Sequence, residues 1–173
     1  MNLNFKNTTN NQPNYEGPRR LKPGIHLVSI TGVTEGESEH KKTPYIQIGF
    51  VDDSGAEHTE KFWTTEKTVE FSSEKIKRIV RGTDQVVPDS ASTEQLHKML
   101  TGKRGYLRLR GEEVVIKNGP QSGKTFVASI YGGFASITKP DSLKFDPVTD
   151  IKKLDQGTVQ ATAASNSTDD LPF

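Results

Sequence analysis

Alternation of apolar and polar positions divides the middle of the chain into strand-like segments. Residues 45–51 alternate most clearly, because Ile46, Ile48 and Phe50 fall on one face and Tyr45 falls on the other. The turn signal DDSG follows directly and predicts that this strand forms a hairpin with the next one. The full set of strands that the pattern predicts is 25–33, 45–51, 56–64, 106–115 and 125–131.

Two helices are predicted between the third and the fourth of these strands. Ser72 or Ser73 can cap a helix that has apolar residues at helical spacing and that Gly82 closes. Ser92 and Gln95 have the spacing of a capping box and predict the start of a second, shorter helix.

The order of these elements predicts the fold class. Three strands, a helical segment and two more strands are the element order of the all-β oligonucleotide/oligosaccharide-binding (OB) fold, a five-stranded Greek-key barrel. We therefore expect an OB-fold domain over residues 21–137. Residues 1–20, rich in Asn and Thr, are predicted to form a flexible arm, and residues 138–173 a disordered linker with an acidic tail.

Composition narrows the class of protein. A chain of 173 residues can bury one sizeable core, but its hydrophobic content of 31% and mean hydropathy of −0.66 suggest that part of it does not pack. It has no cysteine and therefore no disulfide framework. No apolar run approaches the roughly 20 residues of a membrane helix, and the N-terminus lacks a secretory signal pattern. We expect a soluble cytoplasmic protein without a membrane partner.

Charge is distributed unevenly along the chain, although the net charge is only +1. Residues 1–137 carry 19 Lys and Arg against 16 Asp and Glu, a balance of +3, and residues 138–173 carry 4 against 6, a balance of −2. Segment 96–124 is the most basic part, with seven cationic residues against two glutamates. This asymmetry favours a basic surface on the body and an acidic tail, but an uneven solvated surface would look the same.

The sequence gives little support for catalysis. GPQSGKT at 119–125 resembles a phosphate-binding loop, but it has one residue too few before Gly-Lys, and a strand-like segment follows instead of a helix. The four histidines are scattered without metal-ligand spacing, and the neighbours Glu112 and Glu113 point to opposite faces of a strand. We therefore expect a protein that is not an enzyme and holds no cofactor or metal.

Aromatic and basic side chains alternate with the aliphatic positions of the predicted strands. Single-stranded nucleic acid is bound by a positive groove together with aromatic faces on which bases stack. Tyr45, Tyr106, Arg108 and Arg110 stand opposite aliphatic residues, so we expect them outside the core. We expect one barrel face to carry Tyr45, Trp63 and Tyr106 beside Lys61, Arg108 and Arg110. The complete predicted DNA-binding set also includes Lys117, Lys124 and Tyr131.

Aromatic residues in a small barrel more often belong to the core than to a ligand platform. For Trp63 both interpretations stay open, because the third strand has no clean apolar face. Phe126 and Phe134 are predicted to be core residues.

The last five residues carry the most specific signal. The chain ends with Asp169, Asp170, Leu171, Pro172 and Phe173. An apolar ring on an acidic tether is suited to a partner's pocket lined with Arg or Lys. This end resembles the C-terminal tip of bacterial single-stranded DNA-binding proteins, and that resemblance implies recruitment of replication and repair enzymes. The Asn-rich arm and the two helices depart from that family, which suggests a divergent member, such as a phage-encoded one, and does not carry over the family's tetramer.

Three functions remain open after these observations. The first is sequence-independent binding and protection of single-stranded DNA in replication, recombination and repair, with partner enzymes recruited by the tip. The second is a protein-interaction adaptor built on an OB barrel, and the third is an RNA-binding chaperone. The basic segment 96–124 favours nucleic acid over the adaptor, and only the resemblance of the tip favours DNA over RNA.

Overall fold

The computed structural model describes residues 19–154, and this part of the chain is mostly β-sheet. Six strands form one mixed sheet, accompanied by two α-helices and a short 3-10 helix. Within this part, no helix has the length and apolar character that crossing a membrane requires. In chain order the elements are β1 (Gly24–Glu37), β2 (Pro44–Asp52), β3 (Glu57–Trp63), α2 (Val69–Gly82), α3 (Thr93–Leu100), β4 (Arg104–Val115), β5 (Thr125–Ala135), η1 (Pro140–Ser142) and β6 (Ile151–Lys152).

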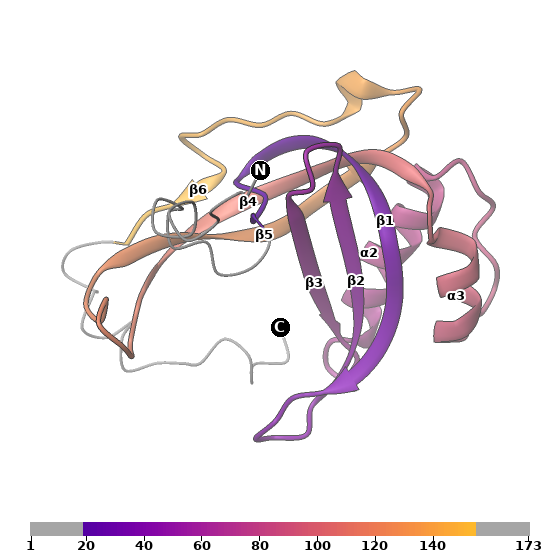
Figure 1. The fold of residues 1–173 in the computed structure, drawn as a ribbon. Coiled ribbons are helices and arrows are strands. Elements are labelled where there is room, and N and C mark those ends of the chain that lie inside the picture. Colours follow the sequence, from indigo (N-terminus) through magenta and orange to yellow (C-terminus); the bar gives the residue numbers. More distant parts are fainter. Residues whose placement is uncertain (1–18, 155–173) are drawn as a thin grey trace, which may run out of the picture.

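Strand β1 organises the sheet because it pairs with two different neighbours along its length. Residues 24–29 pair antiparallel with β4, and residues 28–37 pair antiparallel with β2. The register shifts between Ile30 and Gly32, and β1 curves strongly from one neighbour to the other (Figure 1). The resulting strand order is β3-β2-β1-β4-β5, with β6 parallel to β4.

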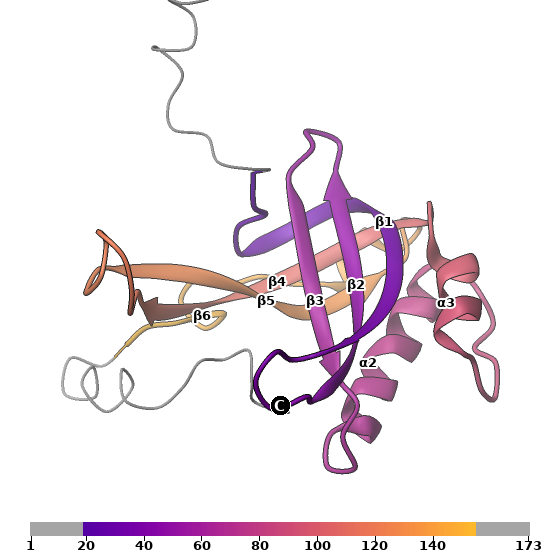
Figure 2. The ribbon, with the colours of Figure 1, turned by 60° about the horizontal axis from the view of Figure 1, so that its bottom comes forward.

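The core lies where the curved sheet meets the two helices. Phe50 of β2 and Leu107 of β4 are at most 1% exposed, and so are Ile79 of α2 and Leu100 of α3. Burial of each such side chain stabilises the fold by roughly 1.5–3 kcal/mol. In Figure 2 both helices lie at one end of the sheet, and the long β4–β5 hairpin projects away from them. The alternation predicted for 45–51 is confirmed, since Ile48 and Phe50 are buried.

Phe134 joins the helical layer to the sheet, which confirms its predicted place in the core. A Cβ atom built on Gly105 of β4 would lie 2.3 Å from the ring of Phe134, and one on Gly82 of α2 would lie 2.4 Å from it. The ring therefore occupies space that only these two glycines leave open. Gly82 does end α2 as predicted, but its role in the structure is this close approach to Phe134.

One of the two predicted helix starts is confirmed and the other is wrong. Ser92 Oγ accepts a hydrogen bond from Gln95 N and Ser92 N donates to Gln95 Oε1, which completes the capping box. Helix α2 instead begins at Val69, before the serines predicted to cap it. The hydroxyl of Ser72 donates to the carbonyl of Trp63, so it binds the end of β3 rather than a helix N-terminus.

The predicted barrel is not closed by a β3–β5 ladder in the described residues. Side chains span this gap instead: Glu60 of β3 accepts a hydrogen bond from the N–H of Tyr131, and Phe62 packs edge-on against the Tyr131 ring at 5.5 Å. Residues 19–21 also run along the start of β3, where Leu21 N donates to Glu57 O. The structure is thus an open, strongly curved sheet.

Residues 138–154, which we call the strap, continue the described fold beyond the predicted domain end at 137. The strap contains η1 and runs along the β4–β5 pair to β6 (Figure 1). Strand β6 pairs with β4 at Gly111 and Glu112, where β1 no longer covers that edge. The apolar residues of the strap contribute unequally to the fold, because Ile151 enters the sheet whereas Val148 is 84% exposed.

Candidate nucleic-acid interface

The outward face of β2 and β3 carries three of the predicted residues, two of them in contact with Tyr45. We call this set the aromatic cluster: Tyr45, Lys61 and Trp63. Tyr45 and Trp63 are register partners, and their rings meet edge-to-face at 5.5 Å. Lys61 Nζ lies 4.8 Å from the centre of the Tyr45 ring, within the range of a cation–π contact. The hairpin register therefore places an aromatic ring beside a cation on the β2–β3 pair.

The two rings of the aromatic cluster differ in accessibility. Trp63 is only 9% exposed, whereas Tyr45 is half-buried. Tyr45 lies across its β1 partner Gly36, where a Cβ would come within 2.7 Å of the tyrosine oxygen. The Trp63 ring therefore packs in the fold against Tyr45, which is the more accessible of the two rings.

The turn between β1 and β2 adds basic side chains at the same end of the sheet, and the sequence analysis did not include them. Lys41 and Lys42 are exposed in this turn, a few residues before Tyr45. Glu37 and Glu39 flank them, so the local charge is mixed. The sequence could have identified the two lysines from their position in the loop before the strand that carries Tyr45, a residue already predicted to bind DNA.

The outward side of β4, here called the β4 face, holds Tyr106, Arg108 and Arg110. Leu107 and Leu109 point the other way and are fully buried, as the alternation predicts. Tyr106 and Arg108 are half-buried and Arg110 is exposed.

The β4 face and the aromatic cluster do not form one surface, which corrects the prediction that they share a barrel face. Along β1, Tyr45 pairs at Gly36 and Tyr106 pairs at Leu27. Nine residues of strand separate these two positions, about 30 Å along β1. The curvature of β1 also turns the two regions in different directions (Figure 1).

Arg108 is bound by the strap rather than open to solvent. Its Nη2 forms an ion pair with Asp150, and its Nη1 donates to the carbonyl of Gly132 at 3.3 Å. The strap and Arg108 together line a shallow cleft on this side of the sheet. The N–H of Asp146 and the guanidinium of Arg108 hold the pKa of Asp150 below its usual value. A phosphate at Arg108 would therefore have to compete with Asp150.

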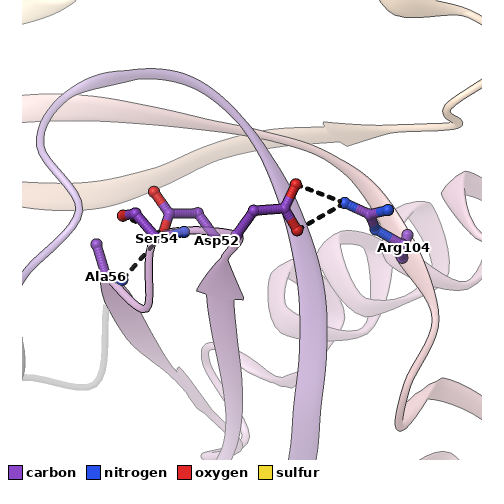
Figure 3. A network of polar contacts seen from close by, with 5 residues as sticks. Asp52, Ser54, Ala56 and Arg104 are labelled. Carbon is purple, nitrogen blue, oxygen red and sulfur yellow. Dashed lines mark hydrogen bonds and ion pairs between the residues drawn. The ribbon is translucent and has the colours of Figure 1, made fainter.

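Arg104, another residue of the basic segment, is also neutralised by a carboxylate. Its Nη2 lies 2.9 and 3.1 Å from the two carboxylate oxygens of Asp53, and dashed lines to the labelled Arg104 mark these contacts in Figure 3. The neighbouring Asp52 closes the β2–β3 turn by accepting bonds from Ser54 and from the N–H of Ala56. The hydroxyl of Ser54 is the main cause of the lowered pKa of Asp52.

Tyr131 is buried in the core, which corrects its predicted role as a stacking residue. The residue is 5% exposed, and its ring packs against Phe62. Burial raises the pKa of its hydroxyl above the usual value. Because neither face of this ring is open to a base, Tyr131 does not belong to the interface.

The loop between β4 and β5 presents Lys117 and Lys124 to solvent. Strands β4 and β5 extend away from the β2–β3 pair, so this loop lies at the end of the β4–β5 hairpin that is far from that pair (Figure 1). Strands on both sides of GPQSGKT exclude the helix that a phosphate-binding loop needs. Phe126, which was predicted to be in the core, is instead 49% exposed on this hairpin, where no second layer formed by residues 19–154 covers the strands.

One predicted feature cannot be located in the described part of the chain. The C-terminal tip, residues 169–173, lies outside the described residues. Within residues 19–154 no group of three His, Asp or Glu side chains is arranged to hold a metal ion. No protein-family model matches the chain, and no curated protein matches it.

Proposed function

We propose that this protein binds single-stranded DNA without sequence preference and is not an enzyme. The observation that carries the proposal is the Tyr45 ring, half-buried on the outward face of β2 with Lys61 Nζ 4.8 Å from its centre. An aromatic face and a cation at one place provide the stacking and the phosphate attraction that single strands need.

The sheet topology gives this proposal further support. A central strand that pairs with both β2 and β4, with helices inserted between β3 and β4, is the layout of an OB fold whose last seam is open. We propose that the chain is such an open OB barrel. In that fold, oligonucleotides bind on the strand 2–3 face, which here carries the aromatic cluster.

A second part of the proposal concerns the tip. Residues 169–173 resemble the tip of bacterial single-stranded DNA-binding proteins, and we propose that they recruit replication and repair enzymes in the cytoplasm. Deletion of Leu171, Pro172 and Phe173 should abolish this recruitment and leave DNA affinity nearly unchanged. The measurement is capture of replication enzymes by immobilised full-length and truncated protein. Equal capture by both proteins would refute this part of the proposal.

The lone tryptophan permits a direct test of the main proposal. Trp63 contacts Tyr45, so a base that stacks on Tyr45 should change tryptophan fluorescence. We expect tight binding of oligo-dT, weaker binding of duplex DNA, and an affinity that falls steeply with salt because counterions are released. Preference for oligo-U over oligo-dT would instead support the RNA-binding chaperone. No binding of either oligonucleotide would favour the adaptor.

A further inference from the structure

The outer edge of β5 is left without a strand partner in the described residues. One edge of β5 pairs with β4, and the strand is last in the sheet order. Ile116 N donates to Lys124 O, so the even-numbered residues of β5 turn their main-chain groups towards β4. The N–H of Tyr131 donates to Glu60 on the opposite side, so the odd-numbered residues face outward. Because the register is unbroken between these points, Thr125, Val127 and Ser129 present N–H and C=O groups to the outer edge.

This edge lacks the features that usually prevent pairing between strands. Natural edge strands carry charges, proline or a covering segment, but residues 125–130 contain no charged residue and no proline. The start of β3, by contrast, is covered by residues 19–21. Phe126 and Val127 are 49% and 41% exposed, so apolar side chains accompany the open main chain.

We propose that the outer edge of β5 pairs antiparallel with the same edge of a second copy, about a two-fold axis at Val127. The outward main-chain groups of Val127 then bind those of Val127 in the second copy. Thr125 binds Ser129 of the second copy in the same way, and Ser129 binds its Thr125. The two hairpins join as one four-stranded ribbon in the order β4-β5-β5-β4.

Side chains in this register are complementary in size. Phe126 lies opposite Ala128 of the second copy, so each large ring faces a small residue. The two Phe126 rings are then diagonal neighbours, within the reach of aromatic side chains. The hydroxyl of Ser129 is engaged within its own chain, where it donates to Leu21 O.

Charge favours a second copy over the other candidate occupants. An edge without charge over residues 125–130 offers no cation to a nucleic acid or to the chain's own acidic tip. Two copies of this edge meet without like-charge repulsion. Lys124, the first charged residue beyond it, lies opposite Ile130 of the second copy, next to Tyr131, where Glu60 supplies a carboxylate. The inference does not depend on the proposed DNA binding.

Oligomeric state is the first test. Light scattering coupled to gel filtration, over a wide range of protein concentrations, should show the full-length chain as a dimer. Val127→Lys places two ammonium groups opposite each other at the axis and should yield a monomer. The matched control is Val86→Lys, since Val86 is 90% exposed between the helices and its variant should remain dimeric. A monomeric wild type, or a dimeric Val127→Lys protein, would overturn the inference.

Cysteine cross-linking tests the register and remains informative if Val127→Lys fails to fold. The chain has no cysteine, so a disulfide can form only between introduced thiols. Directly paired residues have Cα atoms about 5.5 Å apart, which suits a disulfide. Val127→Cys should therefore form a covalent dimer on mild oxidation. Val86→Cys and Ser129→Cys alone should not, but Ser129→Cys mixed with Thr125→Cys should. No more cross-linking of Val127→Cys than of Val86→Cys would refute the proposed axis.

Discussion

The aromatic cluster and the β4 face were predicted by the same alternation rule, yet they differ in what occupies them. In the aromatic cluster, Tyr45 is half-buried and has the ammonium group of Lys61 over its ring. On the β4 face, Arg108 is bound by Asp150 of the strap. Alternation decides which way a side chain points, but it does not show whether another segment of the chain lies over it.

Tyr45→Ala should give the largest change in DNA binding, because it removes the accessible ring. Loss of one stacked base corresponds to about 1–3 kcal/mol, a roughly 5- to 150-fold weaker affinity for oligo-dT. Fluorescence anisotropy of a labelled oligonucleotide measures this change. Phe71→Ala is the matched control, because Phe71 is an aromatic residue that is 73% exposed on α2 and is not a member of the aromatic cluster. Equal losses in the two variants would remove the distinction between this cluster and any other exposed ring.

Arg108→Ala and Arg110→Ala should separate stability from binding on the β4 face. Arg108→Ala removes the ion-pair partner of Asp150 and should lower the melting temperature, measured by thermal unfolding. Arg110 is exposed, so Arg110→Ala should leave the melting temperature unchanged. If it contacts a phosphate, its loss should reduce the salt dependence of DNA binding by about one counterion. If Arg108→Ala instead left the melting temperature unchanged and reduced the salt dependence of DNA binding, the strap would leave Arg108 available to DNA.

The strap contact should also depend on pH. Because the folded pKa of Asp150 lies below the ordinary value of about 3.9, its stabilisation is complete above that pH and is lost as the pH falls through the folded pKa. Asp150→Asn should therefore lower the melting temperature at neutral pH, and its difference from wild type should shrink under acid. The control is Asp141→Asn, which changes an exposed carboxylate of the strap that takes no part in this ion pair. A difference that persists unchanged at low pH would exclude the ion pair as its source.

Trp63→Phe should have the smallest effect on binding. If Trp63 only supports Tyr45, a smaller ring at the same place should change the affinity for labelled oligo-dT less than twofold, which is under about 0.4 kcal/mol. A loss as large as that of Tyr45→Ala would show that the tryptophan itself stacks on a base and that the aromatic cluster opens when DNA binds.

Local patterns predicted the elements of this fold better than its closure. The capping box of Ser92 and the β2–β3 hairpin follow from neighbouring residues, and both are present. The seam between β3 and β5 depends on Glu60 and Tyr131, which are far apart in the sequence. Nothing local to either residue shows that a carboxylate replaces the last strand ladder.

The candidate site was predictable to the extent that strand parity determines it. Tyr45, Lys61 and Arg110 point outward as expected. The burial of Tyr131 was missed because aliphatic and glycine residues around it give β5 no distinct apolar face. The engagement of Arg108 was missed because Asp150 lies in a segment without periodicity, where its pairing depends on tertiary structure.

The ring of Phe134 links Gly82 of α2 to Gly105 of β4, and this has a consequence for how the two positions tolerate change. Each glycine leaves room for the same ring, so an added methyl group at either one would displace it. Once the ring has moved, a methyl group added at the other glycine would no longer meet the ring in its original position. The energetic effects of Gly82→Ala and Gly105→Ala should therefore be non-additive, as for residues in direct contact, although the two residues belong to different layers of the fold.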